Sequence, residues 1–121
     1  MDQPTTARTF PVSAWLTIDA SLDNAVQAAG EELDDPVRQA RLRSIRQAGW
    51  AASAIHPQSG HGFGGWPPND AELSIPLTGS NSESIRQILD KDLSTYRELA
   101  ERDPRFVEEI ALIAEARRWI D

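Results

Sequence analysis

The sequence of 121 residues contains no cysteine, no long apolar run and a single lysine. Without cysteine the chain cannot form a disulfide, a thiolate metal site or a cysteine nucleophile, and this composition is typical of a cytoplasmic protein. No apolar stretch approaches the roughly 18 residues that a membrane-spanning helix requires. The N-terminal segment MDQPTTARTF also lacks the basic and then apolar pattern of a signal peptide. We therefore expect one cytoplasmic domain over residues 1–121, with a flexible N-terminus over residues 1–8.

Acidic residues clearly outnumber basic ones. The chain has 19 Asp and Glu against 12 Lys and Arg, which gives a net charge of −7 at pH 7. An acidic surface repels phosphate backbones, so the charge disfavours nucleic acid as a partner. An excess of acids most often serves solubility. It is also compatible with a basic protein partner or with mimicry of nucleic-acid charge.

The first part of the chain predicts one strand followed by two helices. Apolar residues alternate with other residues in a run typical of a strand with one buried face: Phe10, Val12, Ala14, Leu16 and Ile18. We therefore expect a strand over residues 9–18, and helical spacing of apolar residues then predicts a helix over residues 20–33. Asp35 is a good N-cap and Pro36 suits a first helical position, so a second helix is expected over residues 36–48.

The second part of the chain has a similar pattern. A short extended segment is expected over residues 51–56, and a loop rich in glycine and proline over residues 57–70. Alternating apolar residues predict a strand over residues 71–77. Helical stripes then predict long helices over residues 81–102 and 104–120.

These elements indicate an α+β fold, with a small two- or three-stranded antiparallel sheet and four helices packed on one of its faces. An Asp-Pro pair separates two helices in each half of the chain, at Asp35-Pro36 and at Asp103-Pro104. Each half therefore reads as a strand and two helices. This order is compatible with a βαα pseudo-repeat.

The segment SGHGFGGWPPND is the most unusual in the chain. Its GHGFGG portion matches the G-x-G-x-x-G pattern of dinucleotide sites, but Trp66 and two prolines follow where such a site needs a helix to begin. We therefore reject a dinucleotide site and expect no cofactor. Phe63 and Trp66 are candidate partner-binding residues, because aromatic side chains on adaptable loops make good anchors. The alternative is that one or both fold back onto the core.

Two histidines near this loop suggest a different function. His56, His61 and Asp70 are weak candidate metal ligands, because imidazole and carboxylate groups bind transition metals. Their spacing matches no short chelating turn. A nucleophilic pair of Ser59 with His61 is weaker still, since no acidic residue that would orient the histidine is evident.

Several charged side chains fall on the apolar sides of their predicted helices. Asp92 lies within the stripe of the third helix and Arg117 within that of the fourth, so we expect the two to pair if these helices form an antiparallel hairpin. Arg38 and Arg41 lie on the apolar side of the second helix. They are candidate contacts for an anion or an acidic partner, or they extend their charged ends to solvent.

Leu112 and Trp119 point away from the main stripe of the last helix and are seven residues apart. A second apolar face on a helix is typical of an interface, and a homodimer is its simplest form. The sequence therefore favours a small acidic, non-enzymatic protein that acts by binding another protein, of the inhibitor, immunity, antitoxin or phage and mobile-element accessory type. The alternative is a metal-dependent enzyme or metal-binding protein that uses His56, His61 and Asp70.

Overall fold

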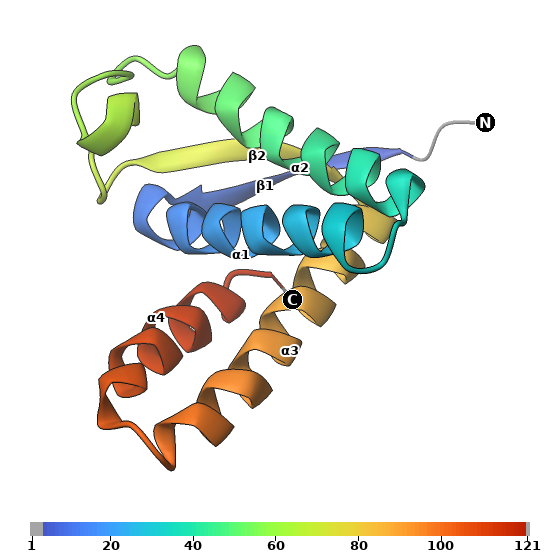
Figure 1. Cartoon of the computed structure of the whole chain (residues 1–121). Coiled ribbons are helices and arrows are strands. Elements are labelled where there is room, and N and C mark those ends of the chain that lie inside the picture. The colour runs from blue at the N-terminus through green and yellow to red at the C-terminus, as the bar shows by residue number, and fades with distance from the viewer. Residues whose placement is uncertain (1–3, 121) are drawn as a thin grey trace.

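Two strands and four α-helices make up the fold, described for residues 4–120 by a computed structural model (Figure 1). In chain order the elements are β1 (Thr5–Pro11), α1 (Val12–Glu31), α2 (Pro36–Ala54), η1 (Phe63–Gly65), β2 (Glu72–Thr78), α3 (Gly79–Ala100), η2 (Pro104–Phe106) and α4 (Val107–Arg117), where η marks a 3₁₀ helix. Of the N-terminus expected to be flexible, residues 5–8 belong to β1, and residues 1–3 lie outside the described residues. None of the described helices has an apolar stretch long enough to cross a membrane.

The sheet consists of β1 and β2 in antiparallel register, with Phe10 opposite Leu73. On β2, Leu73, Ile75 and Leu77 are buried, while the residues between them are exposed. The sheet thus buries one face against the helices and leaves the other in solvent, as alternation in an antiparallel sheet requires. The α+β class, the antiparallel sheet and the four helices are confirmed.

The strand expected over residues 9–18 is wrong beyond Pro11, because α1 begins at Val12. The buried residues of this segment recur every three or four positions, as in a helix, and include Val12, Trp15, Ile18 and Leu22. The alternating interpretation placed Trp15 on the outer face of a strand. Its side chain is in fact fully buried and packs on the ring of Phe10, with the two ring centroids 5.2 Å apart.

The extended segment expected over residues 51–56 is also wrong, because α2 continues to Ala54. The second helix was expected to end at residue 48, but Gly49 lies inside it and is buried. A Cβ atom at Gly49 would overlap the indole of Trp15, so glycine is what lets α2 approach α1 this closely. The sheet is therefore two-stranded.

Helix α1 lies in the middle of the molecule, with α2 on one side and the α3–α4 pair on the other (Figure 1). The two halves of the chain have the same element order, βαα, as the expected pseudo-repeat requires. The Asp35 carboxylate accepts from the Arg38 amide at 3.0 Å and caps α2 as predicted. The Asp103 carboxylate accepts from the Arg105 amide at 3.0 Å, but it begins the 3₁₀ turn η2, and α4 covers only Val107–Arg117 of the helix expected over residues 104–120.

Arg46 joins α2 to α1 by a charged network. Its Nε and Nη2 donate to the two carboxylate oxygens of Asp19 at 3.0 and 3.2 Å, and its Nη1 donates to Asp23 at 2.9 Å. The guanidinium also lies 4.9 Å from the ring centroid of Trp50, close enough for a cation–π contact. The hydrogen bond to Asp19 is the main cause that raises the pKa of Arg46, and the charges of Asp19 and Asp23 add to it.

The Trp15–Gly49 contact predicts a steric penalty for Gly49→Ala. We expect the free energy of unfolding in urea to fall by about 1–3 kcal/mol, because an inserted methyl group overpacks a closed interface. This loss would oppose the gain of about 1 kcal/mol that alanine normally brings to a helix interior. The matched control is Gly79→Ala, where a Cβ meets nothing within 4 Å. Equal stability of the two variants would contradict the prediction.

The Arg46 network predicts that Arg46→Gln lowers the free energy of unfolding by about 1–2 kcal/mol, because the largely buried Asp19 carboxylate loses its charged donors. Arg43→Gln is the control. Arg43 is exposed on the same helix and makes no ion pair within the described residues, so its replacement should change stability by less than about 0.5 kcal/mol. Urea denaturation of both variants at matched ionic strength measures the difference.

Candidate functional site

The outward side of α4 carries the two apolar residues that the sequence singled out. Helix α4 buries Ile113 and Ala116 against the rest of the fold. Leu112 is 53% exposed and Trp119, just after the helix, is 40% exposed. Trp119 follows the end of α4 at Arg117, so helical spacing alone does not fix the direction of its side chain relative to that of Leu112. Neither side chain is enclosed by the described part of the chain.

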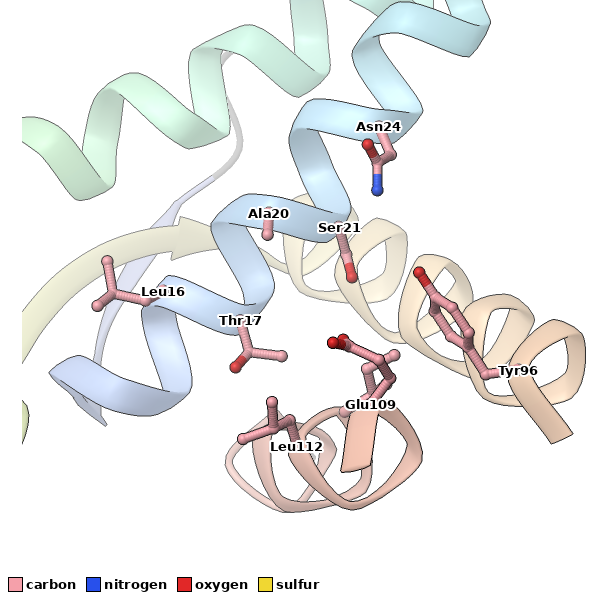
Figure 2. Close-up of a pocket in the computed structure, with 9 residues that line it drawn as sticks. Leu16, Thr17, Ala20, Ser21, Asn24, Tyr96, Glu109 and Leu112 are labelled. Carbon is pink, nitrogen blue, oxygen red and sulfur yellow. The ribbon is translucent and has the colours of Figure 1, made fainter. Parts of the chain in front are cut away.

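Leu112 borders a cleft of about 290 Å³ between α1, α3 and α4, shown in Figure 2. We call it the α1–α4 cleft, and it is lined by Leu16, Thr17, Ala20, Ser21 and Asn24 of α1, Tyr96 of α3, and Glu109, Leu112 and Ile113 of α4. Trp119 does not line this cleft. It borders a shallower hollow further along the chain, together with Glu115 and Arg118.

Polar groups converge inside the α1–α4 cleft. The Ser21 hydroxyl, the Tyr96 hydroxyl and the Glu109 carboxylate all point into it from three different helices (Figure 2). Burial raises the pKa of Tyr96, and the negative charges of Asp92 and Glu109 raise it further. The phenol therefore stays protonated at neutral pH and can both donate and accept a hydrogen bond.

A second cleft of about 200 Å³ adjoins the first, since both are lined by Ser21 and Asn24. Arg38 lines this second cleft, together with Lys91 and Asp92. Arg41 is exposed and is not among the lining residues. The structure therefore does not bring the two arginines together there as one anion site.

The ion pair expected between Asp92 and Arg117 is wrong in its acidic partner. Arg117 Nε donates to a carboxylate oxygen of Asp90 at 2.9 Å instead. Helices α3 and α4 do pack as a hairpin, but Asp90 is exposed, so the pair sits at the rim of their interface. Asp92, two residues later on α3, lines the second cleft together with Lys91 and Arg38.

The glycine-rich loop is held by its own backbone hydrogen bonds. The amide of Gly60 donates to the Gly65 carbonyl at 2.9 Å, and that of Gly62 donates to the Trp66 carbonyl at 2.7 Å. Gly64 and Gly65 have φ values of 64° and 88°, which glycine adopts readily. Trp66 is half-buried and packs against the core, whereas Phe63 is 84% exposed.

The candidate metal ligands do not form a site in the structure. Residues 4–120 contain no group of three or more His, Cys, Asp or Glu side chains that could hold one ion. Nδ1 of His56 instead accepts a hydrogen bond from the Gln58 amide at 3.0 Å. His61 and Asp70 are exposed.

Sequence reasoning missed most residues of the α1–α4 cleft. Ser21, Tyr96 and Glu109 were not among the candidate site residues, and Leu16 was assigned to a strand. Glu109 precedes Leu112 by three residues, so the two lie on neighbouring positions of one helix side. That spacing is the one signal in the sequence that links an acid to the exposed apolar face.

The different burial of the two loop aromatics predicts different effects on stability. Trp66→Ala should lower the free energy of unfolding by about 1–3 kcal/mol, because it removes a side chain packed on the core. Phe63→Ala should change it by less than about 0.5 kcal/mol, because that ring is in solvent. Urea denaturation measures both. An unchanged stability for Trp66→Ala would show that its indole does not support the core.

Comparisons of the chain with protein-family models, with curated proteins and with solved structures give no significant match in any of the three. The function of this protein therefore has to be inferred from its own geometry.

Proposed function

We propose that this is a small acidic cytoplasmic protein that acts without catalysis, by binding another protein through the outward side of α4 and the adjoining α1–α4 cleft. Inhibitor, immunity, antitoxin and phage or mobile-element accessory proteins work in this way. The observation that carries the proposal is that the chain's last segment leaves both Leu112 and Trp119 substantially exposed. A monomer gains nothing in stability from holding a leucine and an indole in water.

The composition of this face fits a protein partner. Tryptophan is enriched among the residues that contribute most to the binding energy of protein interfaces. These residues lie where neighbouring contacts exclude water. Leu112 lies beside a cleft that an incoming side chain can fill. Glu115 and Arg118, which pair with each other at 3.1 Å beside Trp119, provide the polar rim that non-obligate interfaces have.

The partner is either a second copy of the chain or a different protein. In a twofold dimer, the same patch meets itself, so Glu109 and Glu115 of two copies would approach one another. Like charges brought together at an interface weaken it. The acids on this face therefore favour a basic partner over a homodimer, although a homodimer that offsets the two patches avoids the repulsion.

Two variants test this proposal. Leu112→Ala and Trp119→Ala should each raise the dissociation constant for the partner at least tenfold, because each removes an anchor at the centre of the patch. The partner is first isolated by affinity capture from source lysate, and binding is then measured by titration with the purified partner. Sedimentation equilibrium of the protein alone tests the homodimer, against a monomer mass of 13.4 kDa.

Val107→Ala is the matched control. Val107 is 57% exposed on the same helix, but it precedes Leu112 by five residues and so lies about 140° away around the helix. Its replacement should leave binding unchanged. Equal binding by all three variants, or a monomer with no captured partner, would contradict the proposal.

A further inference from the structure

The α1–α4 cleft presents negative charge that the protein itself does not neutralise. Glu109 is the one charged residue among those that line this cleft, and it takes part in no ion pair within residues 4–120, whereas Arg86, Arg117 and Arg118 nearby are paired. Tyr96 lines the same cleft, and after burial the negative charge of Glu109 is among the causes that raise its pKa. The polar end of the cleft is therefore suited to a cation.

A buried hydroxyl gives a second, independent indication of a ligand. Ser21 is only 6% exposed, and its side chain makes no hydrogen bond with any described residue. Its oxygen points into the cleft, toward Tyr96 and Glu109 (Figure 2). Thr17, one turn earlier, differs because its hydroxyl donates to the Ser13 carbonyl at 3.3 Å. The Ser21 hydroxyl therefore keeps its capacity to donate and to accept a hydrogen bond for a group bound in the cleft.

Most of the other residues that line the cleft are apolar. Leu16 and Ala20 line it from α1, and Leu112 and Ile113 line it from α4. A group that matches the whole cleft has an aliphatic stem several carbons long and a positively charged end with several hydrogen-bond donors. Lysine and arginine side chains have this construction, and they bury their stems along apolar surfaces in this manner.

We propose that the α1–α4 cleft receives a lysine or arginine side chain from a basic segment of the protein partner. The stem lies between Leu16 and Leu112, and the charged end meets the Glu109 carboxylate and the hydroxyls of Ser21 and Tyr96. The proposal rests on the proposed function and names the chemistry that the partner contributes. A free polyamine has a similar charge but no attached chain to contact Leu112 and Trp119, so the experiment includes one.

The probes are two acetylated and amidated heptapeptides that differ at one position. The first has a single arginine between two leucines, and the second has citrulline there, which has the same shape without the charge. Binding is followed by the shifts of backbone amide resonances of the ¹⁵N-labelled protein. We expect the arginine peptide to shift the resonances of Ser21, Asn24 and Tyr96, with a dissociation constant at least fivefold below that of the citrulline peptide.

Glu109→Gln and Glu108→Gln provide the matched pair of variants. Glu108 is the adjacent acid on the same exposed turn but does not line the cleft, and both changes alter the net charge equally. Glu109→Gln should reduce the preference for arginine to less than twofold, and Glu108→Gln should preserve it. An equal effect of the two variants would overturn the proposal, as would equal affinity of wild-type protein for both peptides.

Spermidine serves as the third probe. Spermidine that shifts the same resonances while the arginine peptide does not would also overturn the proposal, by showing a site for a free amine. Failure here is separate from failure of the proposed function. Partner binding that depends on Leu112 and Trp119 but not on Glu109 would support the protein-binding role. It would contradict only the proposal that the cleft receives a basic side chain.

Discussion

The close packing of the Trp15 indole against Gly49 is the constraint on which the remaining structure depends. It brings α2 against α1 without an intervening side chain, and it places the largest buried ring of the fold at their crossing. The indole Nε1 is buried there without a hydrogen-bond partner among the described residues, so shape rather than polarity fixes this contact. With one side of α1 occupied in this way, the opposite side is left to meet α3 and α4, and that side lines both clefts.

The sequence predicted correctly those helix starts and strands that are determined by a few neighbouring residues. The two Asp-Pro pairs identified two helix starts, because capping needs only the backbone amides that follow. Strand β2 was found because its buried and exposed residues alternate without ambiguity. The segment after Pro11 was misassigned because its apolar residues fit both periods over the seven positions 12–18, and only the burial of Trp15 decides between them. The second helix was expected to end just before Gly49 for a related reason, because nothing local distinguishes a glycine that ends a helix from one that lets a neighbouring ring pack closely.

In the candidate site too, the sequence predicted what one helix determines and missed what depends on the packing of several helices. Leu112 was found by projecting one helix, because its exposure follows from the position of the buried side of that helix, whereas Trp119 lies past the end of α4. The cleft requires three helices to be placed relative to one another, which no periodicity provides. Assigning residues 12–18 to a strand also removed Leu16 and Thr17 from the helix face to which they belong. Ser21 and Glu109 then had no visible relation, although they point into the same cleft (Figure 2).

The cleft exists because α1 presents small and polar side chains toward α3 and α4 where its other side presents large apolar ones. Ala20, Ser21 and Asn24 cannot fill the space between three helices that Ile113 and Tyr96 only partly close. Larger apolar residues at these positions would bury more surface and stabilise the fold, so their absence is a departure from good packing. Imperfect packing of this kind is expected at functional sites, where a protein binds a partner or a ligand. The same stretch of sequence that weakens the core of the monomer therefore shapes the surface that a partner can complete.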